Sequence, residues 1–171
     1  MRRIIFISAC AIAAAASPAA AQRRPAPTVS VYTDLDLDRC RELRHVEEGS
    51  STEWSCPGYG GIPLWVAIGD ERFDIDARRD NGNFETTSRF NEPGPRVEWR
   101  LRRGRPFAII YRLRTLGAER AEGSVLGVES IGEGRRNGCL IAWVNGAVPD
   151  ANAAARAQAD RFATTFRCGR D

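Results

Sequence analysis

Alternating carboxylates are the first feature of the sequence that could do chemistry. The run from Asp34 to Asp38 reads Asp-Leu-Asp-Leu-Asp, and carboxylates at alternate positions open the calcium loop of EF-hand proteins. The rest of that loop is missing, because its sixth position is Arg39 instead of glycine and its twelfth is His45 instead of glutamate. Aspartate alternating with leucine is also typical of a half-buried strand whose carboxylates face solvent. We therefore expect no metal site here.

A second acidic group consists of Asp74, Asp76 and Asp80, on an expected strand and the turn that follows it. By the same reasoning these carboxylates should face solvent, and no metal is expected to bind them. Acidic residues are nevertheless numerous enough to supply the pair of carboxyl groups that most glycosidases use. The sequence therefore leaves a carboxylate-dependent hydrolase open as a function class.

Other familiar catalytic arrangements lack the residues that they need. His45 is the only histidine, and no serine or cysteine near it stands in a nucleophile-elbow motif. The sequence contains no lysine for Schiff-base chemistry, no Walker loop and no dinucleotide-binding fingerprint. We therefore assign no catalytic residue and no cofactor, and we interpret His45 as a surface residue of a hairpin.

Four cysteines follow the N-terminal segment, and their even number predicts two disulfides in an exported chain. Three connectivities are possible on sequence alone. The segment 47–50 reads as a hairpin turn, and pairing across it places Cys40 opposite Cys56. A strand beginning at Cys139, followed by a helix that folds back on it, would bring Cys168 next to Cys139. We therefore predict the disulfides Cys40–Cys56 and Cys139–Cys168, and no zinc site.

Residues 1–21 read as a secretory signal peptide. Arg2 and Arg3 precede an apolar run from Ile4 to Ala16, and small residues then allow cleavage near Ala21. A lipoprotein-type cleavage at Cys10 and a twin-arginine signal fit the pattern less well. The apolar run is shorter than the ~20 residues that span a bilayer, and no later stretch approaches that length. We therefore expect export to the periplasm or the exterior, with no transmembrane span.

The remaining chain has the length and charge of one nearly neutral domain. Residues 22–27 are expected to form a flexible arm and residues 28–171 a single β-rich domain. The chain has 25 basic residues, all of them arginine, against 22 acidic residues, which gives a net charge of +3. Two of these arginines lie in the predicted signal peptide, so the exported domain is close to neutral. That balance does not favour nucleic acid as a partner.

Basic residues gather between Arg96 and Arg114, whereas the segment 34–53 is rich in acidic residues. Two neighbouring strands could carry a row of guanidinium groups on their solvent face. The candidate binding residues of this row are Arg100, Arg102, Arg112 and Arg114. Such a row would suit an anionic polymer, acidic lipid headgroups or an acidic protein surface. Alternatively, the arginines protect a sheet edge or pair with the acidic segment of the same chain.

Tyr59 is the other candidate binding residue. It lies in an irregular segment, Cys56 to Pro63, that contains three glycines and two prolines. An exposed aromatic ring on a disulfide-tethered loop could stack on a sugar or dock into a partner. The alternative, which we favour, is a tight connection between strands with Tyr59 folded back on the core. Glycines most often occur where the backbone adopts a conformation that other residues avoid.

Period-two alternation of apolar residues predicts roughly eight to ten short strands. Leu64–Ile68 is continuously apolar, which is typical of a strand buried on both faces. Besides the hairpin around residues 47–50, the other expected strands cover residues 28–32, 73–76, 84–90, 97–102, 107–113, 125–131 and 139–144. The expected fold class is α+β: mostly antiparallel β, sandwich or barrel-like, with one C-terminal helix packed on the sheet and two disulfides.

An alanine-rich segment from Asp150 to Phe166 predicts the helix. Its apolar positions recur at helical spacing, with small alanines first and Phe162 and Phe166 at the end. Small side chains permit close approach to a sheet. We expect the two phenylalanines to fill the core.

The run from Tyr32 to Cys40 and the segment from Trp54 to Tyr59 resemble a family of exported proteobacterial proteins with no assigned function. The resemblance extends to the strand at Cys139 and the final helix. It implies export and a self-contained domain, but no activity, ligand or catalytic residue. The favoured expectation is a non-catalytic envelope protein that binds another envelope protein or an anionic polymer, and the alternative is a small cell-wall or polysaccharide hydrolase.

Overall fold

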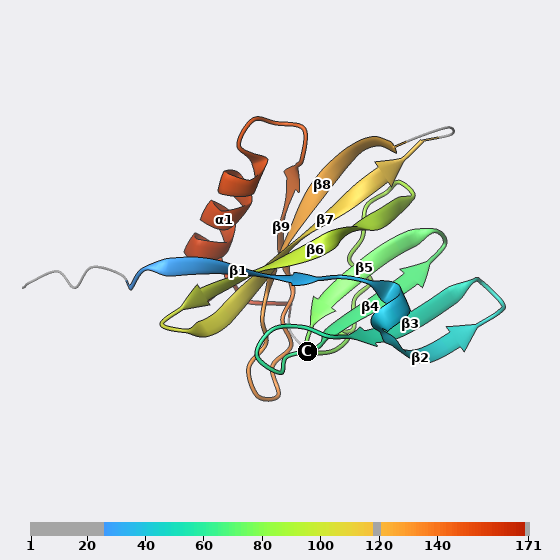
Figure 1. Ribbon diagram of the computed structural model, residues 1–171, viewed down its shortest axis with the longest axis horizontal. Coiled ribbons are helices and arrows are strands. Elements are labelled where there is room, and N and C mark those ends of the chain that lie inside the picture. The colour runs from blue at the N-terminus through green and yellow to red at the C-terminus, as the bar shows by residue number, and fades with distance from the viewer. Residues whose placement is uncertain (1–25, 118–120, 170–171) are drawn as a thin grey trace, which may run out of the picture.

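The computed structural model describes residues 26–117 and 121–169, and these residues form two antiparallel sheets and one α-helix (Figure 1). The predicted signal peptide, residues 1–21, lies outside the described residues, as does the first part of the predicted arm. Within the described residues, no helix has the length and apolar character needed to cross a membrane. The expectation of a mostly β fold with a single C-terminal helix is confirmed.

The smaller sheet has four strands in sequence order. They are β2 (Arg41–Val46), β3 (Ser51–Cys56), β4 (Leu64–Gly69) and β5 (Arg72–Ala77). The turn between β2 and β3 places Gly49 at φ 90°, a conformation that glycine adopts without steric penalty. In β4, Leu64 to Ala67 are buried on both faces, as the continuous apolar run predicted.

The larger sheet has five strands in the order β1-β6-β7-β8-β9. They are β1 (Thr28–Asp34), β6 (Asn91–Arg102), β7 (Arg105–Leu116), β8 (Ala121–Ser130) and β9 (Leu140–Asn145). A short 3-10 helix (Leu37–Arg39) follows β1 and leads into the smaller sheet. Strand β1 therefore pairs with β6, far along the chain, while the smaller sheet is formed by the residues between them (Figure 1).

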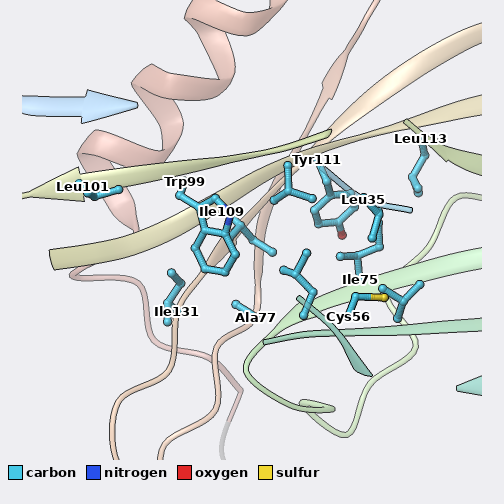
Figure 2. Packing of buried hydrophobic residues seen from close by; sticks show 13 residues of the cluster. Leu35, Cys56, Ile75, Ala77, Trp99, Leu101, Ile109, Tyr111, Leu113 and Ile131 are labelled. Carbon is cyan, nitrogen blue, oxygen red and sulfur yellow. The ribbon is translucent and has the colours of Figure 1, made fainter. Parts of the chain in front are cut away.

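The main core lies between the two sheets. Large side chains of the five-stranded sheet, among them Trp99, Ile109 and Leu113, are fully buried. They face Leu64, Val66 and Ile75 from the smaller sheet in one hydrophobic cluster, part of which Figure 2 shows. The sheets do not join into a closed barrel, so the arrangement is a two-layer sandwich.

Helix α1 (Ala151–Phe162) covers the opposite face of the five-stranded sheet (Figure 1). Its buried residues are Ala151, Ala155 and Ala159, which pack on Ile110 and Val128. These short side chains let the helix lie close to the sheet, as predicted.

Both predicted disulfides are confirmed. Cys40 and Cys56 join the two ends of the β2–β3 hairpin, with their Cα atoms 4.3 Å apart. Cys139 and Cys168 have Cα atoms 5.7 Å apart and tie the segment after α1 to the start of β9. The first disulfide holds a hairpin, and the second returns the C-terminal segment to the sheet.

Four local predictions were wrong. Residues 84–90 form irregular structure instead of a strand. Residues 37–39 form a 3-10 turn in which Asp36 accepts a hydrogen bond from the backbone of Asp38, so the acidic run is not a continuous strand. Helix α1 ends at Phe162. Phe166 is 45% exposed and Phe162 lies beside Arg161, so the alanines of α1, and not these phenylalanines, form the helix contact with the sheet.

The outer edge of β5 is covered by side chains of other segments. The Phe73 N–H donates to Oδ1 of Asn91 at 3.0 Å, and the Ala77 N–H donates to Oε1 of Glu129 at 3.1 Å. The hydroxyl of Thr86 donates to the carbonyl of Phe73 at 2.6 Å. Backbone groups that would otherwise lack partners at a sheet edge are therefore satisfied here.

Candidate functional site

The predicted arginines lie on adjacent strands, but they do not form one continuous row. Arg100 lies opposite Ala108, and Arg114 lies opposite Glu92, because the pairing of β6 with β7 shifts between Pro93 and Val97. The four arginines therefore belong to three separate environments. Arg100 and Arg102 bind Asp160 near the end of α1, Arg112 lies beside Asn152 at the start of α1, and Arg114 lies on the surface.

Arg100 is buried and belongs to an ion-pair network between the sheet and α1. Its Nε and Nη2 donate to the two carboxylate oxygens of Asp160 at 3.0 and 2.7 Å. Arg102 donates to the backbone carbonyl of Asp160 at 2.9 Å, and its guanidinium lies 4.7 Å from the Phe107 ring centre. Although burial opposes the effect, hydrogen bonds from Arg100 and Thr28 lower the pKa of Asp160. These two arginines fix the helix on the sheet.

Arg114 pairs on the surface with Glu92 at 3.0 Å, where both side chains are nearly half exposed. Tyr59 folds back on the core and packs against Trp99, with ring centres 6.2 Å apart. Its position agrees with the interpretation of the 56–63 segment as a tight connection. Within the part of the chain that the structure describes, neither residue lines the cavity that contains Arg112.

Arg112 lies in a different setting: a groove of about 470 Å³ between the five-stranded sheet and the start of α1. Three arginines, Arg96, Arg112 and Arg156, line it together with Tyr32, Glu98, Asn152 and an apolar floor that includes Ile110 and Leu126. We call this the arginine groove. Its volume is within the usual range for small-molecule sites.

Two features of the backbone shape the arginine groove. The register of β6 is interrupted between Pro93 and Val97, so the Gly94-Pro95-Arg96 segment bulges and forms part of the wall. Gly94 also makes room for Arg112, because a Cβ atom at Gly94 would lie 3.3 Å from Cβ of Arg112. A Cβ atom at Gly146 would lie 2.5 Å from Nη1 of Arg112. Gly94 therefore leaves space for the first carbons of the Arg112 side chain, and Gly146 leaves space for its guanidinium.

Hydrogen bonds orient Arg112 without neutralising it. Its Nη1 donates to Oγ of Ser124 at 2.6 Å and its Nη2 donates to Oδ1 of Asn152 at 3.2 Å. Arg96 places its guanidinium 5.8 Å from the centre of the Tyr32 ring. Among the described residues, neither arginine forms an ion pair with a carboxylate.

The third arginine of the groove is paired. Arg156 Nε donates to Oε1 of Glu98 at 2.6 Å, and its Nη2 donates to the Tyr32 hydroxyl at 2.9 Å. The hydrogen bond to Glu98 raises the pKa of Arg156. The lining residues therefore include three cations and one anion, which leaves the groove with an excess of positive charge.

Residues that the sequence placed on a solvated face form a buried acidic cluster instead. Asp74 and Asp76 are both 0% exposed, and Glu129 is 1% exposed. Residues 78–90 cover the two aspartates, because the Glu85 N–H donates to Asp74 and the Asn81 N–H donates to Asp76. The prediction that Asp74 and Asp76 face solvent was wrong.

His45, Asp74 and Asp76 lie outside the arginine groove. His45 is exposed on β2, with Nδ1 2.8 Å from Oγ1 of Thr52, as expected for a surface histidine of a hairpin. Across residues 26–117 and 121–169, no group of three or more His, Cys, Asp or Glu side chains has a geometry that could hold a metal ion. Asp74 and Asp76 are inaccessible to a substrate in this conformation, so they do not resemble a working glycosidase pair.

Comparison of the chain with protein-family models, with curated proteins and with solved structures gives no match. Function therefore has to be argued from the site itself.

Sequence reasoning identified Arg112 but missed Arg96 and Arg156, which lie outside the alternation used to find the row of arginines. The one available signal for Arg96 was its position in a Pro-Gly-Pro-Arg segment, where a strand is expected to bulge.

Proposed function

We propose that this protein is an exported, non-catalytic binding protein that holds anionic groups of an envelope polymer in the arginine groove. The observation that carries the proposal is the pair Arg96 and Arg112. Both line one cavity of about 470 Å³, and neither has a carboxylate partner among the described residues. A guanidinium recognises carboxylate and phosphate oxygens through paired N–H donors.

The surroundings of the arginines support an anionic ligand with an uncharged body. Ile110 and Leu126 offer apolar contact, while Tyr32 and Asn152 supply further polar groups at the rim. Tyr32 is 50% exposed, so its ring is accessible to a polymer that extends beyond the groove. Export is supported by the N-terminal pattern of residues 1–21 and by the two disulfides.

Binding to two polymers of different acid type tests the proposal. We expect residues 22–171, with disulfides intact, to bind short-chain polyphosphate or oligogalacturonate in isothermal titration calorimetry, and not uncharged dextran. Arg112→Gln and Arg96→Gln are each expected to weaken binding at least about tenfold, since a lost charge-assisted hydrogen bond is worth about 1.5–3 kcal/mol. The polymer that binds with the higher affinity identifies the type of acid that the groove prefers.

Arg114→Gln is the matched control, because it removes the same charge from the same strand but outside the groove. It is expected to change the affinity by less than about twofold. Equal losses in Arg112→Gln and Arg114→Gln would show a general charge effect and would count against the groove. Failure of the unaltered protein to bind either polymer would reject the anionic polymer as ligand.

A further inference from the structure

The half-buried Glu85 joins Asp74, Asp76 and Glu129 of the buried acidic cluster, so four carboxyl groups come together from three parts of the chain. Asp74 and Asp76 come from β5, Glu85 from the segment 78–90 and Glu129 from β8. Asn81 joins two of them, since its Nδ2 donates to Oδ1 of Asp76 at 2.7 Å and to Oε2 of Glu85 at 2.9 Å. Two acids therefore share one amide donor, which places their oxygens close together.

These carboxyl groups hold the segment 78–90 against the smaller sheet. Oδ2 of Asp74 accepts from the Glu85 N–H at 3.0 Å, and Oδ2 of Asp76 accepts from the Asn81 N–H at 2.8 Å. Glu85 extends the attachment to β9, because its Oε2 accepts from the Leu140 N–H at 2.9 Å. Release of the carboxyl groups would therefore free the segment at two points along its length.

Among the described residues, no positively charged group forms a hydrogen bond or an ion pair with the cluster. Apart from the four carboxyls, the titratable groups near it are Asp80 in the covering segment and Tyr111 on β7. Of the nearest arginines in sequence, Arg72 binds Asp70, Arg79 binds the carbonyl of Gly134, and Arg78 is exposed. No ion pair within the described residues involves Asp74, Asp76, Glu85 or Glu129.

One oxygen of the cluster has no hydrogen-bond partner among the residues that the structure describes. Oδ1 of Asp74 is buried and makes no hydrogen bond, although the residue is 0% exposed. A buried carboxylate oxygen without a donor is strongly disfavoured, whereas the same group in its protonated, neutral form is tolerated. The cluster is therefore more stable when some of its carboxyl groups are protonated, because no ion pair with a cation neutralises them among the described residues.

We propose that Asp74, Asp76, Glu85 and Glu129 form a proton-dependent latch, which holds the segment 78–90 on the smaller sheet while the cluster carries protons and releases it when the cluster becomes fully charged. Charging several buried carboxyls brings like charges together in a poorly solvated place. Lifting the segment admits water and relieves that repulsion.

The pKa values of the buried carboxyl groups agree with this proposal. Burial raises the pKa of Asp74 to about 7, with the nearby Glu85 charge adding to the effect. Burial and the adjacent Asp74 raise the pKa of Asp76 to about 8. Burial, with Asp76 next in importance, also raises the pKa of Glu129 well above its usual value. The folded protein therefore keeps protons in the range where an unfolded chain has lost them.

The sign of the pH dependence follows from these directions. An acid whose pKa is higher in the folded state stabilises the fold fully below its unfolded pKa of about 4, and that stabilisation is lost as pH rises through the folded pKa. The pKa values of Asp74 and Asp76 place this loss of stability between about pH 4 and pH 8. The protein should therefore become less stable as pH rises from 5 to 8.

The latch also controls a second cavity. The segment 78–90 contributes Asp80, Gly82, Asn83 and Phe84 to the lining of a cavity of about 460 Å³, whose lining also includes Trp65 and Ala67 from β4. Release of the segment would remove that part of the lining. Protonation of the acidic cluster therefore determines whether this cavity keeps its shape.

Equilibrium unfolding of the unaltered protein at a series of pH values tests the proposal first. We expect the unfolding equilibrium constant to rise at least about tenfold between pH 5 and pH 8. Each extra proton that the folded state holds makes this constant rise tenfold per pH unit. Hydrogen exchange, corrected for intrinsic rates, should show protection of the Asn81 and Glu85 amides falling over the same range before that of amides in β7.

Asp74→Asn is the most informative variant. The asparagine oxygen can accept the Glu85 N–H, while its amide group takes the place of the oxygen that has no partner. We expect this variant to show a shallower pH dependence and greater stability than the unaltered protein at pH 8. Asp70→Asn is the matched control, because Asp70 is 75% exposed on its side chain and pairs with Arg72 on the surface. It should leave the pH dependence unchanged.

Three results would overturn the latch. The first is an unfolding equilibrium that stays constant or shifts toward the folded state from pH 5 to pH 8. The second is uniform loss of amide protection, with residues 81 and 85 no more sensitive than β7. The third is recovery of their protection by calcium at pH 8, which would show that a cation and not a proton neutralises the cluster.

Discussion

Replacement of Trp99 by alanine is expected to lower the free energy of unfolding by about 3–5 kcal/mol. Trp99 is 0% exposed and lies between the two sheets (Figure 2). Its Nε1 donates to Oγ1 of Thr33 at 2.8 Å, so β1 loses a hydrogen bond together with the packing. Chemical denaturation followed by circular dichroism measures the change.

The close fit around Trp99 explains why the loss should be near the top of that range. A Cβ atom at Gly58 would lie 2.8 Å from the indole ring, so the ring packs directly on the backbone of the 56–63 segment. Tyr59 covers it from the same segment. Trp99→Phe is the control, because it keeps an aromatic ring and should lose clearly less stability. A loss below about 1 kcal/mol for Trp99→Ala would contradict the central role assigned to this side chain.

Replacement of Arg100 by alanine is expected to have an effect of similar size, about 3–5 kcal/mol, because it removes a buried guanidinium and leaves the Asp160 carboxylate without its ion-pair partner. Arg100 has 7% of its side chain exposed and contacts Asp160 through two hydrogen bonds and Glu98 at 3.8 Å. Glu98 is equally buried, and it also accepts a hydrogen bond from Ser30. The loss of Arg100 therefore affects both β1 and α1.

Two variants make this prediction specific. Arg100→Lys keeps the charge but not the two parallel donors, so its stability should fall between those of the alanine variant and the unaltered protein. Arg114→Ala removes an arginine whose pair with Glu92 is nearly half exposed, and it should cost no more than about 1 kcal/mol. Equal losses for Arg100→Ala and Arg114→Ala in urea denaturation would refute the distinction between the buried and the surface pair.

Most elements of the fold could be predicted because their residues alternate or cluster with regular spacing. The hairpin closed by Cys40–Cys56 and the return of Cys168 to Cys139 both followed from counting along strands and a helix. Residues 84–90 were assigned wrongly since Phe84 and Phe90 suggest alternation, whereas the intervening polar groups bind β5 through hydrogen bonds with distant residues. Local pattern does not report such long-range bonds.

The candidate sites were harder to predict for the same physical reason. Alternating Asp74 and Asp76 look identical to solvent-facing residues unless the covering segment 78–90 is known. The four arginines lie in buried, surface and groove environments because the register of β6 shifts and because α1 covers part of the sheet. Both depend on how distant elements pack, which residue types alone do not determine.

The side chains along β5 have a consequence for self-association. An open sheet edge offers unpaired N–H and C=O groups to a second chain, and this contact starts many forms of aggregation. Asn91, Glu129 and Thr86 occupy that position on β5, so a second copy would have to displace them before it could add a strand. The opposite edge of the same sheet, β2, carries exposed charges and an irregular register between Glu42 and Arg44. Neither edge of the smaller sheet is therefore suited to growth into a larger assembly.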